Sequence, residues 1–88
     1  HLAAAWYARI ANERAVDASR RQVEAARLSY EGAQAELAVG VRTTLDVLDA
    51  EQDLFEAQLA EVSAQRDYYV ATAQILRLLG AIDPARMA

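Results

Sequence analysis

Two carboxylates, Asp46 and Asp49, stand three residues apart near the middle of the 88-residue sequence, shortly after Arg42. On a helix this spacing places them about 60° apart around the axis, one turn above the other. If several copies formed a ring, these carboxylates would line its mouth with negative charge, which selects for cations. A simpler explanation is favoured by the chemistry alone, because the helix dipole stabilises acidic residues in a first turn. Arg42 is then a solvated turn residue.

The remaining residues offer little for catalysis or metal binding. The single histidine is His1 and there is no cysteine, so a histidine-based triad, a two-histidine metal site and a thiolate site are all excluded. The formal net charge is −4 and no long basic run occurs, which argues against a nucleic-acid partner. No apolar run approaches the roughly 20 residues that a membrane-spanning helix needs. We therefore expect no enzyme, no cofactor and no metal ion.

Two long helices must position the acidic pair. The sequence holds 21 alanines but only three glycines and one proline, and alanine is the best helix former. We predict a helix over about residues 2–38, a tip over about 39–43, a second helix over about 43–79 and a tail over 80–88. So short a connection makes the helices antiparallel neighbours. Gly32 is explained either by close packing or by tolerance of a cost of roughly 1 kcal/mol.

Glycine, threonine and proline mark the helix ends. Gly40 suits the left-handed conformation that follows a helix C-terminus, because it has no Cβ to clash. Thr43 and Asp46 have the spacing of a capping box at the start of the second helix. Gly80 is expected to end that helix and Pro84 to prevent it from resuming. The predicted fold is therefore an all-α antiparallel hairpin.

Apolar residues recur every seven positions in both helices, which is the pattern of a left-handed coiled coil. In the second helix the row of large side chains is Leu48, Phe55, Val62, Tyr69 and Leu76. Two further rows are Ala50, Ala57, Ala64, Ala71 and Leu78, and Val47, Leu54, Tyr68 and Ile75, the last of which is interrupted by Glu61. In the first helix the rows are Val16, Val23, Tyr30 and Leu37, and Ala4, Ala11, Ala18 and Ala25. A lone hairpin cannot cover so many apolar sides, so we infer that further helices pack against it.

The tip carries the most specific sequence. From Gly40 to Ala50 it reads Gly-Val-Arg-Thr-Thr-Leu-Asp-Val-Leu-Asp-Ala, and the second helix later carries Asp67-Tyr68 and closes with Leu78-Leu79-Gly80. This combination resembles the last periplasmic hairpin of the TolC family of outer-membrane channels. The likeness is densest over residues 30–80. The chain also begins without methionine or a capping residue, so we expect it to be an excised segment.

The resemblance implies an assembly and partners. In that family three protomers form a homotrimer whose hairpins pack into a long periplasmic α-barrel. The channel lies in the outer membrane, and this segment would lie in the periplasm. It would serve drug efflux or type I secretion with a periplasmic adaptor, also called a membrane-fusion protein, and an inner-membrane transporter.

The resemblance also implies roles for residues of the tip. Asp46 and Asp49 would form the acidic constriction, or gate, of the periplasmic entrance, and Arg42 would link neighbouring hairpins. The other tip residues would meet the adaptor: Gly40, Val41 and Thr43. Some relatives have an aromatic residue where this sequence has Leu37 and a threonine where it has Val41. Both residues belong to the linking network in those relatives, so the departures make the link by Arg42 a weaker expectation than the acidic constriction.

Two other interpretations fit a two-helix chain. The hairpin of a periplasmic membrane-fusion adaptor has the same shape, but its arginine–leucine–serine tip pattern is not found around Gly40. The other interpretation is a purely structural coiled-coil module with no role in transport.

Overall fold

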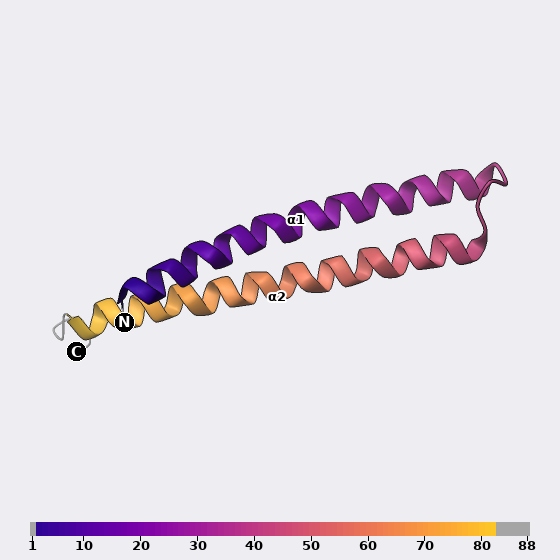
Figure 1. Ribbon diagram of the computed structural model, residues 1–88. Coiled ribbons are helices and arrows are strands. Elements are labelled where there is room, and N and C mark those ends of the chain that lie inside the picture. Colours follow the sequence, from indigo (N-terminus) through magenta and orange to yellow (C-terminus); the bar gives the residue numbers. More distant parts are fainter. Residues whose placement is uncertain (1, 83–88) are drawn as a thin grey trace.

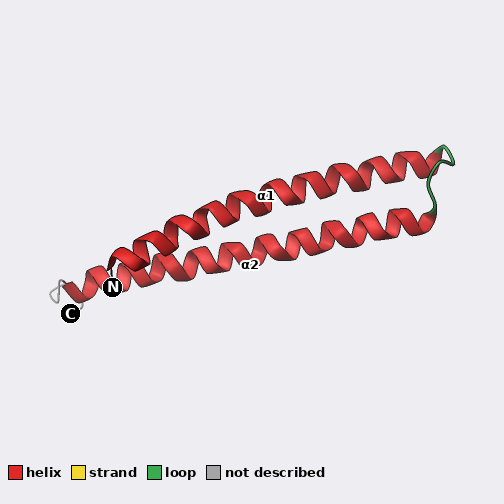
Figure 2. Ribbon diagram, in the orientation of Figure 1, coloured by secondary structure: helices red, strands yellow, loops and turns green. Residues whose placement is uncertain are grey.

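The computed structural model describes residues 2–82, which form two long helices joined by a short turn. Helix α1 spans Leu2–Ala38 and helix α2 spans Thr44–Ile82. The two helices run antiparallel and side by side, and the start of α1 lies beside the end of α2, opposite the turn (Figure 1). The hairpin measures 67 × 21 × 13 Å. The predicted all-α hairpin is confirmed, and helix accounts for all of the described chain except the turn (Figure 2).

A thin apolar seam joins the helices. Its buried residues are Val16, Val23 and Ala33 from α1, and Ala57, Ala71 and Ile75 from α2. Three of the six are alanines, whose small side chains allow two helix backbones to approach closely. Because the described chain buries so few large side chains, the seam alone covers only part of the apolar surface of either helix.

Polar side chains bridge the seam. Glu61 interrupts an otherwise apolar row, and its Oε2 lies 3.6 Å from Arg20 Nε of α1. Gln65 Nε2 donates to the same Glu61 oxygen at 3.3 Å. The Tyr30 hydroxyl donates to the Glu51 carboxylate across the helices at 3.0 Å. This bond raises the pKa of Tyr30 above its usual value, because it sets the hydroxyl against a carboxylate.

A second apolar side of α2 faces solvent. The heptad row of large side chains lies outside the seam, and each member is more than half exposed: Leu48 54%, Phe55 59%, Val62 63%, Tyr69 74% and Leu76 64%. An exposed row of large apolar side chains of this kind marks an interaction surface. Neither helix within residues 2–82 is apolar enough over a sufficient length to cross a membrane.

The structure corrects one expected helix end. Helix α2 continues through Gly80 to Ile82, so Gly80 does not end it. Among the described residues only Gly40 has a positive φ, and a glycine in right-handed geometry merely costs roughly 1 kcal/mol relative to alanine. The stop expected at Pro84 lies outside the described residues.

Gly32 is not a close-packing point within this hairpin. A Cβ built on Gly32 would meet no atom within 4 Å besides its own helix backbone. The sequence left two explanations for Gly32, close packing and a tolerated loss of helix stability. Within the hairpin itself, the tolerated loss is the one that applies.

Candidate functional site

The turn begins with a hydrogen-bonded end to α1. The Gly40 N–H donates to the Leu37 carbonyl at 3.0 Å, and the Val41 N–H donates to the Glu36 carbonyl at 2.9 Å. These two bonds form a Schellman motif, which satisfies carbonyls that the helix end would leave free. Gly40 has a φ of +83°, so the left-handed conformation predicted for it is confirmed. Glycine is needed here because any side chain would be strained.

Helix α2 begins with a reciprocal capping box. The Thr43 N–H donates to Asp46 Oδ2 at 3.1 Å, and the Asp46 N–H donates to Thr43 Oγ1 at 3.2 Å. The backbone hydrogen bond from Thr43 lowers the pKa of Asp46, and the Thr43 hydroxyl lowers it further. Asp46 is therefore both a structural cap and a residue that stays ionised at neutral pH.

Arg42 is held by its own hairpin. Its Nε donates to Glu36 Oε2 at 2.5 Å, which ties the turn to the last turn of α1. This hydrogen bond and the charge of Glu36 raise the pKa of Arg42. The family resemblance implied a link between neighbouring hairpins for Arg42. The partner of Arg42 in the hairpin is Glu36, which lies in the same hairpin and was not among the expected site residues.

Asp49 has different surroundings from Asp46. It lies on the exposed surface of α2, one turn beyond the capping box. Among residues 2–82, no hydrogen bond or ion pair involves its carboxylate. The structure therefore pairs Thr43 with Asp46 and Arg42 with Glu36, and it leaves Asp49 outside both pairs.

The tip also exposes apolar surface. Val39 is 75% exposed, Val41 69% and Leu45 65%, and Gly40 and Thr43 are exposed between them. A Schellman motif is often accompanied by an apolar contact from the residue after the glycine. Here that residue is Val41, and the matching position in α1 is Glu36, so Val41 remains free for another partner.

More carboxylates follow the acidic pair on the same side of α2. Asp53 and Glu56 lie seven residues beyond Asp46 and Asp49, which is one heptad along the coiled coil. Both line a shallow groove between the helices, in which α1 contributes small side chains such as Ala25 and Ser29. The seven-residue spacing is the sequence signal for this extension, although Asp53 and Glu56 were not among the expected site residues.

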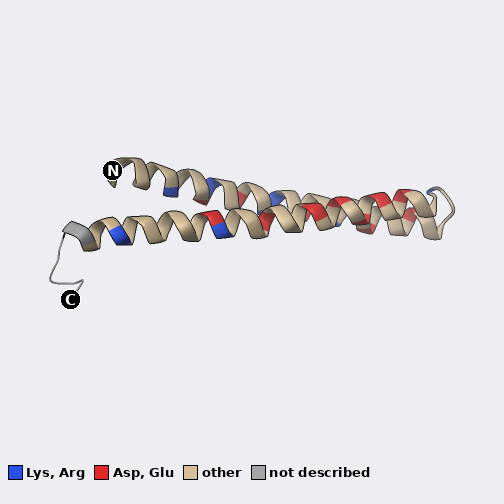
Figure 3. Cartoon of the chain, turned by 90° about the horizontal axis from the view of Figure 1, so that it is seen from below, with Lys and Arg blue, Asp and Glu red and all other residues tan. Residues whose placement is uncertain are grey.

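Charge is distributed unevenly along the hairpin. Residues 31–60, which surround the turn, contain seven acidic side chains and one arginine, a formal net charge of −6. The other described residues contain five acidic side chains and seven arginines, a formal net charge of +2. The positions of acidic residues, red in Figure 3, gather toward the turn. The tip half is therefore the part that attracts cations.

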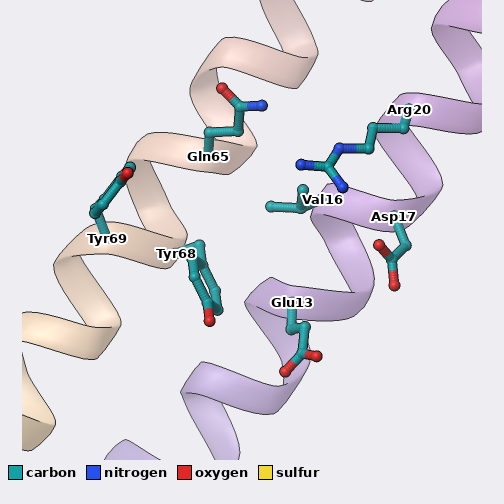
Figure 4. A pocket seen from close by; sticks show the side chains of 7 residues that line it. All are labelled: Glu13, Val16, Asp17, Arg20, Gln65, Tyr68 and Tyr69. Atoms are coloured by element: carbon teal, nitrogen blue, oxygen red, sulfur yellow. The ribbon is translucent and has the colours of Figure 1, made fainter.

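The half of the hairpin away from the turn contains an open groove between the helices (Figure 4). It is lined by Glu13, Val16, Asp17, Arg20, Gln65, Tyr68 and Tyr69. Tyr68 points toward α1, whereas Tyr69 points away from it. Arg9 donates to the Tyr68 hydroxyl at 3.2 Å and lies over both the Tyr68 and Trp6 rings, 5.6 Å from each centre. These contacts fasten the two helices together, and no group of side chains that could hold a metal occurs within residues 2–82.

The fold and tip define a class of protein: a long coiled-coil hairpin with an acidic, capped turn and an exposed apolar side. Residues 1–81 match the family described as outer membrane efflux protein. The chain belongs to this family, and the recognition drawn from the tip sequence is confirmed. Membership assigns the protein to the outer membrane.

One curated relative supports the same assignment. The chain is 40% identical over 79 residues to the outer membrane efflux protein BepC of Brucella suis biovar 1 (strain 1330). The aligned region covers 90% of this chain but 17% of the relative, so the chain spans a small part of that protein's length. No solved structure matches the chain.

Proposed function

We propose that this hairpin forms part of the periplasmic entrance of a trimeric outer-membrane channel for efflux or type I secretion. The observation that carries the proposal is the capped acidic turn, which presents Asp46 and Asp49 at one end of a hairpin from a family of efflux proteins. Transport through such an entrance requires shape and charge but no bond-making chemistry, so we propose no enzymatic role.

Asp46 and Asp49 form the gate in this proposal. Three protomers bring six carboxylates to the threefold axis, where they repel one another and attract cations. The hydrogen bonds from Thr43 support this role, because they lower the pKa of Asp46 and keep it charged. The absence of any described partner for Asp49 leaves its carboxylate available to ions. Asp53 and Glu56 extend the negative surface inward from the gate.

The exposed side of α2 is covered, in this proposal, by other helices of the channel. The stripe that runs through Phe55 and Tyr69 is more than half exposed in the hairpin, although it is apolar at every heptad. An exposed apolar stripe of this kind marks a surface against which other helices pack. An α-barrel of several hairpins supplies those helices on both sides of each hairpin.

Arg42 and the exposed turn complete the proposed entrance. Arg42 contributes to polar links that hold neighbouring hairpins together in the closed state. The exposed backbone and side chains of Gly40, Val41 and Thr43 form the surface on which the periplasmic adaptor docks, and through the adaptor the channel meets an inner-membrane transporter. Opening exchanges contacts between protomers for contacts with the adaptor.

The test is single-channel recording of the full-length channel in a planar bilayer. We compare the wild type with the Asp46→Ala, Asp49→Ala double variant and measure the reversal potential in a salt gradient. The wild type is expected to be cation-selective, and the double variant is expected to lose most of that selectivity. A Thr43→Ala variant is the control, because it removes the hydroxyl that accepts the Asp46 N–H but leaves both carboxylates. Equal selectivity in all three proteins would remove the gate assignment.

A further inference from the structure

The ion pair between Glu36 and Arg42 spans the turn of the hairpin. Glu36 holds this turn twice: its carbonyl accepts the Val41 N–H, and its carboxylate accepts the Arg42 Nε–H. The side chains of Glu36 and Arg42 are 44% and 48% exposed, so a competing partner can reach the pair. Glu36 is thus the nearest carboxylate to the one cation of the tip half.

We propose that Glu36 positions Arg42 within its own hairpin and thereby opposes the link between hairpins that closes the channel. This inference rests on the proposed function, in which Arg42 contributes to the closed state. It adds a residue with the opposite effect: Glu36 favours opening because it withholds Arg42 from the neighbouring hairpin.

The geometry of the guanidinium explains the competition. Arginine offers five N–H donors in a fixed fork, and the strongest contacts with a carboxylate use two parallel donors. Glu36 occupies the Nε side of Arg42. A neighbouring hairpin can therefore use the remaining Nη donors, but it cannot use the edge that includes Nε until Glu36 releases it.

The expected size of the effect follows from the exposure of the pair. Exposed ion pairs are weak, so one pair shifts an equilibrium by roughly twofold to fivefold. In a trimer three such pairs act on one open–closed equilibrium, and the combined shift is roughly tenfold to a hundredfold. Salt screens exposed charges, so the shift should shrink as ionic strength rises.

The experiment uses the full-length channel in a planar bilayer and measures the ratio of closed to open time at low and high salt. Glu36→Gln keeps the shape of the side chain and removes the charge, so it should raise that ratio, and more strongly at low salt. The matched control is Glu31→Gln, which removes one charge from an exposed position on the same helix and should leave the ratio near that of the wild type. A ratio in Glu36→Gln that equals the control, or falls below it, overturns the inference.

A charge swap separates competition from simple stabilisation of the turn. The Glu36→Arg, Arg42→Glu double variant can reform the ion pair inside the hairpin, but it offers no cation at position 42 to a neighbour. Under the inference it should open as readily as Arg42→Gln. A swap variant that closes as the wild type does would mean that the pair only stabilises the turn, and the inference would be wrong.

The same recordings distinguish this inference from the function on which it rests. If the Asp46→Ala, Asp49→Ala variant loses selectivity while Glu36→Gln behaves like its control, the gate stands and only the role of Glu36 fails. If no variant forms a pore, the proposed function fails and this inference fails with it.

Discussion

The two ends of the hairpin are held together by different kinds of interaction. Toward the chain ends, buried side chains such as Val16, Ala71 and Ile75 join the helices. Around the turn no residue from 38 to 45 is buried, and directional hydrogen bonds fix the backbone instead. Apolar burial tolerates many substitutions of similar volume, whereas a Schellman motif and a capping box require particular residues. The tip therefore has the more specific sequence. The two paired helices outside the turn, here called the shaft, tolerate more variation in sequence.

The largest expected effect tests the shaft. Ile75 is 7% exposed in the seam, and its neighbour Leu76 is 64% exposed on the other side of α2. In the 88-residue chain, Ile75→Ala should lower the free energy of unfolding by about 2 kcal/mol, because it leaves a cavity in the seam. Leu76→Ala should change it by less than about 0.5 kcal/mol. Urea denaturation followed by far-ultraviolet circular dichroism measures both values.

Equal losses in the two variants would break the comparison, because they would mean that the outer side of α2 is also packed in solution. Repeating the denaturation at several protein concentrations identifies that case. A stripe buried by self-association makes unfolding depend on concentration, whereas a monomeric hairpin unfolds at the same urea concentration throughout.

The next prediction compares the effect on stability of the same substitution, glycine to alanine, at one position in the tip and one in α1. Gly40 has a φ of +83°, so Gly40→Ala should destabilise the chain by about 1–2 kcal/mol. Gly32 has helical geometry and open space around its Cα, so Gly32→Ala should stabilise it by about 1 kcal/mol. The same denaturation measurement should therefore give opposite signs for the two variants.

A destabilising Gly32→Ala would contradict the packing described for α1 in the isolated hairpin. The same substitution in the full-length channel asks a further question. A gain of stability in the hairpin combined with a loss of closure in the channel would indicate that another helix approaches Gly32 in the assembly. The two measurements together separate the hairpin from its surroundings.

Local features of the tip could be predicted from the sequence. The left-handed Gly40 and the capping box of Thr43 and Asp46 depend on residues within a few positions of each other, so their spacing was sufficient. The partner of Arg42 was not predicted, because Glu36 comes within reach only when the turn has folded. A charged residue six positions away carries no periodic signal in the sequence.

The heptad rows show a different limit. They identified which side chains are apolar, but they did not say which row faces α1. The row with the largest side chains, which includes Phe55, lies outside the seam, while the alanine row, which includes Ala57 and Ala71, lies within it. The choice depends on how the turn aligns the helices and on partners beyond the hairpin, neither of which appears in the spacing. The helix end expected at Gly80 was wrong for a related reason. A glycine ends a helix when it adopts the left-handed conformation, and the sequence alone does not say whether it does so.

The smallest expected effect concerns the acid sensitivity of the tip. Hydrogen bonds from the Thr43 N–H and hydroxyl lower the pKa of Asp46 below its usual value of 3.8. A carboxyl whose pKa is lower in the folded chain adds stability above its unfolded pKa and loses it as pH falls through the folded value. The stability difference between wild type and Asp46→Asn should thus be present at neutral pH and shrink below about pH 3.8.

Asp49→Asn is the matched variant, because it makes the same chemical change one turn along α2 and leaves the capping box intact. Denaturation of the three proteins at a series of pH values isolates the contribution of the cap, since all their other carboxyl groups titrate in common. If the Asp46→Asn difference stays constant into strong acid, the carboxylate does not cap the helix. If Asp49→Asn shows the same acid-dependent loss, the effect belongs to the helix dipole and not to the hydrogen bonds of Thr43. Only a loss confined to Asp46 assigns the acid sensitivity to the geometry of the turn, and it would mean that the residue proposed to attract cations at the gate also holds the start of α2 in place.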